Sequence, residues 1–596
     1  TRRDGPRIIV EVEEELDKTG SYTLVLSNPD TGVDIQEPVD VNPLWDAEYN
    51  EMYSDKELGY IFEDGVSTFR LFVPRCRVVE LHLFDSYDDE VAQEVYEMTP
   101  DEDMVFEVSI DGPLYGRYYG YRIAERLAQP SSFNPTIPLD TIFADPYGRV
   151  TVSNNVFPQV GRTLIYDTES FDWQGDAPLQ APLSQAVIME MHVRDLTAHE
   201  TAGTEYPGTF IGMIDATTGG INYLRELGVN AVEFLPIQDF ANIEAPYGES
   251  SFGYTNTWNA YAENYWGYMT TNFFSPETYF ATDGTLDPDA WNGTDGRVVD
   301  ELKTVIRELH SNGMSVLMDV VYNHVSAYDE NALKIIDHDF YFKDQDGTGT
   351  GNEVETRRRM VRRMVIDSVL YWMEEYHIDG FRFDLAASHD RATIEAIWEA
   401  AREVNPDVWL IAEPWGGEGA TSAAEFIEIG WSKWNDGIRN AVRSQNRPTG
   451  RGNAWPLGNN PGAAREITRW WTGNHTGTST QYVQYIESHD DATFGDILRY
   501  LSGTYSITDS QGNINRIDDI PGYLELDDSL ISANQVAAAT LFLTQGPVML
   551  HLGQEWARGK ITPDLSGVVP EVTDNGQLGS SSDNVVYRTP SPNSYS

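Results

Sequence analysis

The chain has almost no cysteine and no long apolar run. Its 596 residues include one cysteine, Cys76, which excludes a disulfide within the chain and a thiolate metal site. No apolar run reaches the ~18 residues needed to cross a bilayer. The N-terminus, TRRDGPRIIVEVEEEL, lacks the apolar segment of a secretory leader. Because the chain starts at Thr1, two locations stay open: secretion with a leader already removed, or the cytoplasm.

Basic residues are also scarce. Lys and Arg total 40 against 95 Asp and Glu, for a net charge of −55. This charge disfavours nucleic acid and anionic membrane as partners. The acids are spread over the whole chain, and salt would screen their repulsion, with a Debye length of ~3 Å at 1 M. We therefore predict a protein from a high-salt organism, with an ordinary acidic secreted protein as the alternative.

The length and patterning predict two or three domains. Residues 1–57 read as a β-rich N-terminal extension of unknown role. In residues 58–143, period-2 runs broken by turn residues, such as STFRLFVPRCRVVELHLFD, predict an antiparallel β-sandwich. Residues 144–185 are turn-rich and read as a linker. From 186 to 596, buried strands alternate with helical segments, which predicts an α/β fold, a (β/α)8 barrel.

Seven of the eight barrel strands stand out as apolar runs. They are expected at 186–191, 229–237, 315–321, 379–385, 408–413, 481–490 and 547–555. The sixth is not sharp, and we place it just before the segment GWSKWNDGIRNAV.

Charged residues gather where these strands end. Four segments share this feature: DVVYNH (319–324), GFRFD (380–384), AEPW (412–415) and ESHDD (487–491). A charge at the end of a buried strand costs free energy unless it is paired or used. Four such ends in order indicate a catalytic constellation at one face of the barrel.

These segments resemble the α-amylase family of glycoside hydrolases, from about Val187 to about Glu555. The sandwich resembles the carbohydrate-binding-like module that precedes the barrel in debranching and branching enzymes, where it either binds glucan or only packs on the barrel. Family members usually continue with a last barrel helix and a β-sandwich domain. This chain instead stops in SSSDNVVYRTPSPNSYS, so either it is a fragment that lacks them or its barrel closes in another way, and we expect a fragment.

Retaining hydrolysis of an α-glucosidic bond needs two carboxyl groups roughly 5–5.5 Å apart. Asp384 is our predicted nucleophile, because Arg382 lies two residues earlier, on the same side of the strand, and would keep it ionised. Glu413 is the predicted acid, because it follows the apolar run VWLIA, which raises a carboxyl pKa. The resemblance implies that Asp490 is the third carboxylate, which grips sugar hydroxyls and stabilises the transition state.

The resemblance also implies the substrate contacts. His324 and His489 suit the hydroxyls of the sugar at the cleavage position, and Tyr268 matches a tyrosine that stacks under the ring. Arg382 and Trp415 complete the predicted substrate-binding set.

Two further groups are weaker candidates. In α-amylases, the asparagine at the position of Asn323 often binds calcium. In debranching enzymes it is commonly a structural residue, so Asn323 is only a weak metal candidate. Structural calcium is possible and no cofactor is required. Glu190, His192 and Arg194 resemble the first-strand signature, and we expect them to support the barrel floor and loops.

The bond specificity follows from mixed signatures. NYWGYMTTNFFSPETYFA and GWSKWND resemble isoamylase, whereas YIESHDDATFGD is closer to pullulanase and some α-amylases. The leading prediction is an α-1,6 debranching hydrolase of starch- or glycogen-type α-glucans, and an endo-acting α-1,4 amylase is the alternative. A transglycosylase and a non-catalytic glucan-binding protein rank lower, because all three carboxylates are present.

Overall fold

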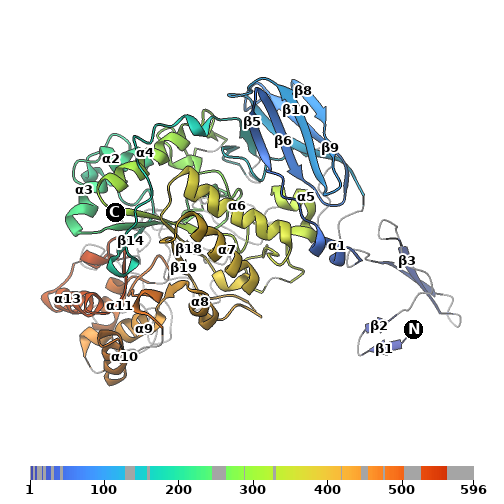
Figure 1. Cartoon of the computed structure of the whole chain (residues 1–596). Coiled ribbons are helices and arrows are strands. Elements are labelled where there is room, and N and C mark those ends of the chain that lie inside the picture. Colours follow the sequence, from blue (N-terminus) through green and yellow to red (C-terminus); the bar gives the residue numbers. More distant parts are fainter. Residues whose placement is uncertain are drawn as a thin grey trace.

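The computed structural model describes residues 44–127, 141–156, 161–243, 264–444, 454–502 and 525–559, apart from gaps of one to four residues, and short pieces of 2–39. Near the N-terminus, β1 (Arg2–Asp4) pairs with β2 (Arg7–Ile9), and β3 (Tyr22–Asn28) pairs with β4 (Val33–Val39). Figure 1 shows these hairpins standing apart from the rest of the molecule. Helix α1 (Asp46–Glu51) follows them. No helix in the described ranges is long and apolar enough to cross a membrane.

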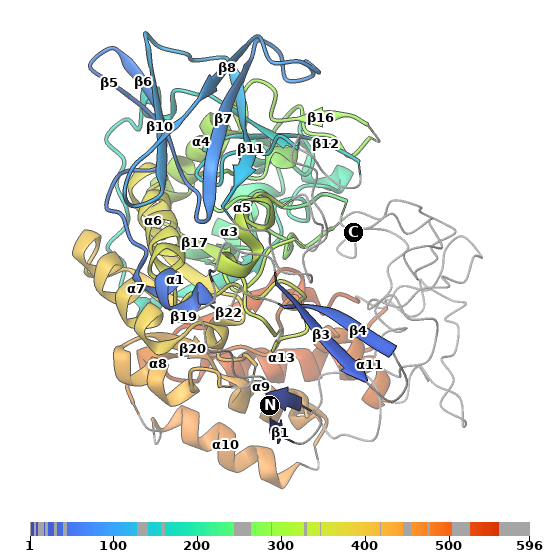
Figure 2. The ribbon, with the colours of Figure 1, turned by 90° about the vertical axis from the view of Figure 1, so that its right-hand side faces the viewer.

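Two antiparallel sheets form the sandwich beside the barrel (Figure 2). One has the order β5-β6-β10-β9, with β5 (Gly59–Glu63), β6 (Val66–Phe72), β9 (Thr99–Pro100) and β10 (Val105–Asp111). The other has the order β16-β12-β13-β11-β7-β8, with β7 (Cys76–Phe84), β8 (Glu94–Glu97), β11 (Tyr118–Arg126), β12 (Thr151–Asn154), β13 (Gly161–Leu164) and β16 (Trp291–Asn292). Buried and less buried residues alternate along β6, as a half-buried strand requires. The sheet takes β12 and β13 from the predicted linker and β16 from a barrel loop; the domain boundaries stay predictions.

Eight parallel strands form the barrel. They are β14 (Val187–Met191), β15 (Ala231–Phe234), β17 (Ser315–Val320), β18 (Gly380–Phe383), β19 (Trp409–Ala412), β20 (Ser432–Trp434), β21 (Tyr482–Val483) and β22 (Val548–His551). They run in the order β21-β20-β19-β18-β17-β15-β14-β22. Gln484 closes the ring, because its N–H donates to Pro547 O and its carbonyl accepts from Met549 N, both at 2.8 Å. The predicted fold class, a (β/α)8 barrel preceded by a β-sandwich, is confirmed.

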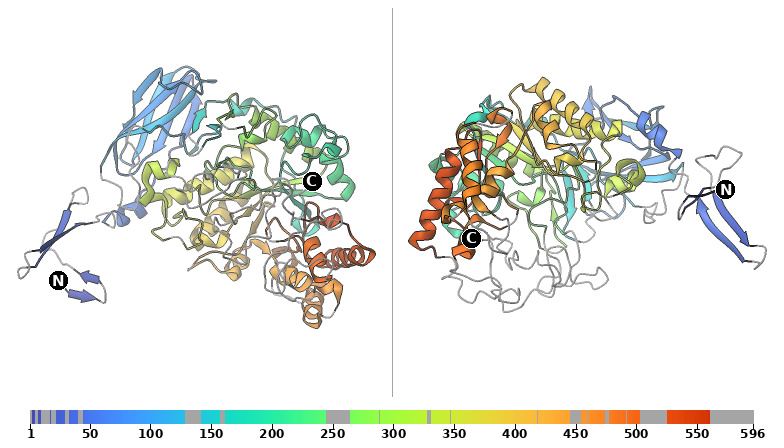
Figure 3. Two further views of the ribbon diagram at one scale, coloured as in Figure 1. Left: turned by 180° about the vertical axis from the view of Figure 1, so that it is seen from behind. Right: turned by 90° about the horizontal axis from the view of Figure 1, so that it is seen from below.

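Helices surround the strands (Figure 3). The described ones are α2 (Phe210–Asp215), α3 (Gly220–Leu227), α4 (Arg297–Ser311), α5 (Ala332–Tyr341), α6 (Arg359–Glu375), α7 (Arg391–Val404), α8 (Ala423–Ile429), α9 (Asp436–Arg443), α10 (Pro461–Trp471), α11 (Phe494–Ser502) and α13 (Asp528–Phe542). Helix α4 shows the reason, because apolar residues at helical spacing, such as Val298, Leu302, Val305 and Leu309, are buried.

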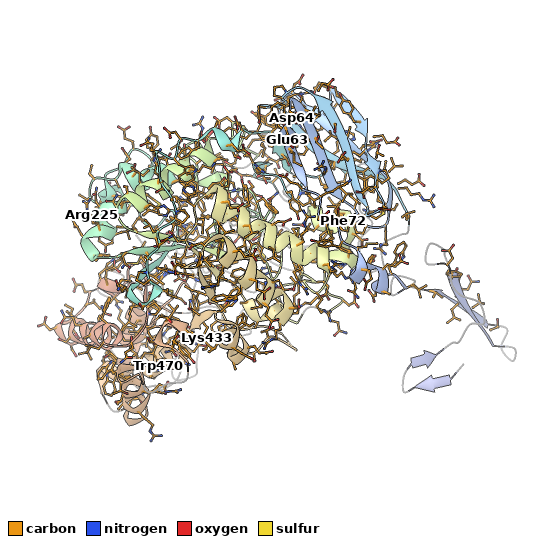
Figure 4. The ribbon with its side chains drawn as sticks, viewed as in Figure 1. Glu63, Asp64, Phe72, Arg225, Lys433 and Trp470 are labelled. Atoms are coloured by element: carbon orange, nitrogen blue, oxygen red, sulfur yellow. The ribbon has the colours of Figure 1, made fainter. Side chains whose placement is uncertain are left out.

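The prediction for the sixth strand was wrong. It was placed before the segment GWSKWNDGIRNAV, but β20 lies inside that segment and pairs with β19 and β21. Ser432 and Trp434 are buried, while Lys433 between them is not. A polar, three-residue strand of this kind gives no apolar run to detect. Figure 4 labels Lys433 on this strand and Trp470 on α10, and in the sandwich it labels Glu63 at the end of β5 and Asp64 on the turn that follows.

The barrel interior changes character along its axis. An apolar cluster includes Ile188, Ala231, Leu317, Ile411 and Met549, one from each of five strands. Side chains alternate along a strand, so the residue two positions later points the same way. Those residues are Glu190, Glu233, Asp319, Glu413 and His551. The carboxyl ends of the strands therefore enclose a buried charged layer above an apolar one.

Candidate functional site

Two neighbouring strands place the first pair of carboxyl groups. Asp384 follows the last residue of β18 and Glu413 the last residue of β19, and Phe383 and Ala412 are register partners. Leu385 takes the left-handed conformation, with φ 40°, which turns its N–H onto Glu413 Oε2 at 2.9 Å. A non-glycine residue in this region costs on the order of 1–3 kcal/mol, so the fold stores strain beside Asp384.

The Arg382 guanidinium joins the carboxyl groups. It is fully buried, and its Nη1 lies 2.8 Å from Asp319 Oδ1 and 3.1 Å from Asp384 Oδ1. Its Nη2 lies 2.9 Å from Glu413 Oε2. A buried guanidinium needs such partners, because its desolvation is otherwise uncompensated. One cation therefore holds carboxyl groups from three consecutive barrel strands in a fixed arrangement.

The two strand-end carboxyl groups differ in their protonation. Burial alone would raise the pKa of Asp384, but the Arg382 charge, the nearby His324 and a hydrogen bond from Asn323 hold this pKa below its ordinary value. Burial raises the pKa of Glu413 to about 8, and the negative charges of Asp384 and Asp490 add to this effect against Arg382. Near neutral pH, one group is a carboxylate and the other a proton donor, as acid–base or nucleophilic chemistry needs.

His489 is the second cation of the site. Its Nδ1 lies 2.7 Å from Glu190 Oε1, and its backbone N–H donates to Glu190 Oε2 at 2.8 Å. Burial would lower the pKa of His489, but Asp490 and Glu190 raise it to about 9, so the ring is an imidazolium. The Tyr268 ring stacks on His489 with centroids 4.9 Å apart. Its hydroxyl donates to Asp319, which links this aromatic pair to Arg382.

Asp490 extends toward solvent. Its side chain is 40% exposed, and Oδ1 lies 3.6 Å from His489 Nε2. Among the three predicted catalytic carboxyl groups it is the most accessible, because the side chains of Asp384 and Glu413 are 12% and 3% exposed. An accessible carboxylate beside two buried ones suits contact with the hydroxyl groups of a bound molecule.

Asn323 and His324 lie on the other side of Asp384. Asn323 Nδ2 donates to Asp384 Oδ2 at 2.8 Å, and Asn323 Oδ1 lies 2.6 Å from His324 Nδ1. Protein groups thus engage both ends of the carboxamide that was the weak metal candidate. Within the described residues, no group of three or more His, Cys, Asp or Glu could hold a metal ion.

The structure brings the predicted set together around Arg382 and His489. Trp415 lies at the edge of this set and is partly buried. Its ring is 6.4 Å from the ring of Trp434, and the Arg382 guanidinium lies over that second ring. His192 stacks on Tyr265, a neighbour of Tyr268, and so supports this loop as expected of the first-strand signature. Glu190 lies in the upper charged layer rather than at the floor.

Sequence reasoning missed three interior residues of the site. Trp434 packs against Arg382, His551 Nδ1 lies 2.6 Å from Glu190 Oε2, and Glu233 lies opposite Glu190 on β15. Period-2 alternation from the apolar interior positions would have found Glu233 and His551. Trp434 lies on the strand that was misplaced, so no signal was available for it.

Comparison with known proteins gives relatives of one kind. No family model matches the chain. Isoamylase 1 of rice (Oryza sativa subsp. japonica), a chloroplastic protein, is 30% identical over 442 residues, which are 65% of this chain and 52% of the rice protein. The pullulanase of Bacillus subtilis is 28% identical over 547 residues, 86% of this chain and 67% of that protein. The chain thus spans about half to two thirds of the length of these relatives.

Solved structures of pullulanases are also similar. The type I pullulanase of Bacillus subtilis in complex with maltose has a TM-score of 0.68 at 27% identity, over 88% of this chain and 68% of that one. The pullulanase of Anoxybacillus sp. LM18-11 in complex with maltotriose has a TM-score of 0.70 at 25% identity, over 90% of this chain and 71% of that one.

Proposed function

Because the chain belongs to the debranching group of the α-amylase family of glycoside hydrolases, we propose that it hydrolyses α-1,6 branch bonds of starch- or glycogen-type α-glucans with retention. Its relatives are named isoamylase and pullulanase, and the similar structures hold maltose or maltotriose. The proposed partner is therefore an α-glucan chain, whose branch point lies over the carboxyl ends of the barrel strands.

The first step uses both strand-end carboxyl groups. Asp384 attacks the anomeric carbon, while Glu413 gives its proton to the glycosidic oxygen as that bond breaks. A covalent ester then links the anomeric carbon of the branch chain to Asp384, and the main chain leaves with the donated proton on its O6 hydroxyl. Glu413, now a carboxylate, takes a proton from water, which attacks the same carbon and frees Asp384. Two inversions give net retention.

The surrounding groups bind the sugar. Asp490 and the His489 imidazolium form hydrogen bonds with the hydroxyl groups of this sugar. His324 contacts the same sugar ring from the opposite side. The Tyr268 face offers stacking to the apolar face of glucose, and Trp415 offers a second aromatic surface beyond it. Arg382 keeps Asp384 ionised and fixes its orientation.

One observation carries this proposal: a single buried guanidinium holds Asp384 and Glu413 on adjacent strand ends, while their surroundings move the two pKa values apart. Separated pKa values in one site assign the acid and the nucleophile. A purely structural ion pair would leave no carboxyl group protonated near neutral pH.

Product analysis tests the proposal. The protein is incubated with pullulan, amylopectin and linear amylose in buffers up to ~3 M KCl, where salt screens surface charge almost completely. Linear chains released from amylopectin, with amylose intact, are the expected result, and cleavage of pullulan to maltotriose would identify a pullulanase rather than an isoamylase. Shortening of amylose would instead identify an α-1,4 amylase. Absence of products at every salt concentration would contradict an enzymatic role.

A further inference from the structure

One carboxyl group in the charged layer has no part in the proposed mechanism. Glu233 lies on β15, opposite Glu190 of β14 in the strand register, and it is fully buried. Within the part of the chain that the structure describes, neither of its side-chain oxygens has a hydrogen-bond partner. A buried, unpartnered polar group is rare in folded proteins and calls for a physical explanation.

The charges around Glu233 come from every strand near it. Glu190 of β14 and Asp319 of β17 are negative neighbours, whereas Arg382 of β18 and His489 after β21 are positive ones. Both cations are already paired: Arg382 with Asp319, Asp384 and Glu413, and His489 with Glu190. His551 of β22 faces Glu190, but burial and the nearby Arg558 lower its pKa to about 3, so it adds no charge.

A further negative charge, on Glu233, would therefore be uncompensated. An ionised carboxylate buried without a partner costs far more free energy than its neutral acid. It would also compete with Asp384 and Glu413 for Arg382. Burial raises the pKa of Glu233 well above its ordinary value, and Glu190 and Asp319 raise it further, which agrees with the geometry.

We propose that Glu233 is a positioning residue: it stays a neutral carboxylic acid and donates a hydrogen bond, through an internal water, to the carboxylates that flank Arg382. Ordered waters are the usual partners of buried polar groups that lack a protein partner. The donor keeps Asp319 in the ionised form that anchors Arg382, and Arg382 in turn anchors Asp384. The inference rests on the proposed function.

Asp319 is the group that this donor would affect. Burial raises its pKa to about 6, against the charge of Arg382 and the hydrogen bond from Tyr268. Loss of a further donor would raise this pKa again, so that Asp319 takes up a proton near neutral pH. Arg382 would then lose one of the two carboxylates that pair with it, and the reacting groups would shift.

Three variants test the proposal in the whole chain. Glu233→Gln keeps the shape, the neutrality and a hydrogen-bond donor, so it should keep kcat and both limbs of the pH profile within about twofold. Glu233→Leu removes the donor, and kcat should fall by ~10- to 100-fold, as expected for misplaced reacting groups, with the acid limb moved to higher pH. Glu399→Leu makes the same change at an exposed position of α7 and should behave as the wild type.

Infrared spectroscopy gives a readout that does not depend on activity. At pH 7, the wild-type spectrum should contain the C=O band of a protonated carboxyl group that Glu233→Gln lacks. No such difference, or a Glu233→Gln pH profile shifted by a full unit, would overturn the proposal, as would full activity of Glu233→Leu. If the wild type hydrolyses no α-glucan, the proposed function fails, while the infrared band still decides the protonation of Glu233, including when Glu233→Leu does not fold.

Discussion

Glu413→Gln should reduce activity and increase stability in a single substitution. The amide cannot donate a proton to the leaving oxygen, so kcat should fall by ~10²–10⁴-fold, the usual contribution of general acid catalysis. The effect on stability has the opposite sign. In the folded protein the pKa of Glu413 is about 8, against an ordinary value of 4.5. Between these values the folded chain holds a proton that the unfolded chain has released.

The sign and size follow from proton linkage. A folded state that binds more protons than the unfolded state loses stability as pH rises. Between pH 5.5 and 7.5, the wild type should lose on the order of 2–3 kcal/mol through Glu413, because each pH unit of this range changes the free energy of unfolding by about 1.4 kcal/mol. The amide of the Glu413→Gln variant has no such proton to release. The stability advantage of the variant over the wild type should therefore grow by up to this amount over the same range.

Two measurements check this prediction. Urea unfolding of both proteins at pH 5.5 and 7.5, at one salt concentration, gives the stability difference at each pH. Steady-state hydrolysis of amylopectin is compared with cleavage of a nitrophenyl α-maltoside. The nitrophenolate leaving group of this second substrate departs without protonation, so its cleavage does not need the proton of Glu413. The variant should lose much more activity on the first substrate than on the second.

A stability difference that does not change with pH would refute the reasoning, since it would mean that Glu413 is not protonated in the folded state. Equal loss of activity on both substrates would refute the acid role in a different way. The substitution Glu399→Gln, at an exposed position of α7, serves as the control for removing one acid from the chain.

Other variants and conditions test other contacts. Asp384→Asn should lower kcat by ~10⁴-fold or more, as for loss of a nucleophile, while calorimetry still detects maltotriose binding. His310 lies 3.0 Å from both Asp176 and Asp379, which raise its pKa although burial alone would lower it. The charged His310 ring stabilises the fold fully below its pKa in the unfolded chain, ~6.5, and this contribution is lost as the pH rises above its pKa in the folded protein. His310→Gln should therefore cost more stability at pH 6 than at pH 9, which thermal unfolding at both pH values would measure. With a net charge of −55, the wild-type melting temperature should rise from 0.1 to ~3 M KCl; a fall would contradict the high-salt prediction.

The barrel was predictable wherever its strands are apolar on both faces. Runs such as SVLMDV and VWLIA mark β17 and β19, because a parallel strand is covered on each side. Strand β20 was missed because Lys433 interrupts it and its three residues are too few for a pattern. The contribution of β16 to the sandwich could not be predicted either, since it joins segments far apart in the sequence.

The sequence indicated which residues lie together at the strand ends, but it did not indicate most of their contacts. The spacing of Arg382 and Asp384 indicates one shared face of a strand, and the structure gives the expected ion pair. The same guanidinium also reaches Asp319 and Glu413, which depends on the closure of the barrel. The left-handed Leu385 has no sequence signal, because leucine does not favour this conformation.

The charged layer at the carboxyl ends of the barrel strands consists largely of paired groups. Hydrophobic side chains at the five positions above the apolar cluster would contribute more to the free energy of unfolding, because buried ion pairs contribute little net stability. The pairs instead fix where charge lies: Arg382 is shared by three carboxyl groups, and Glu190 is held between His489 and His551. Removing one partner leaves an uncompensated charge that pulls on the others. Substitutions that remove a charge from this layer should therefore change the protonation and position of Asp384 and Glu413, even where they touch no substrate.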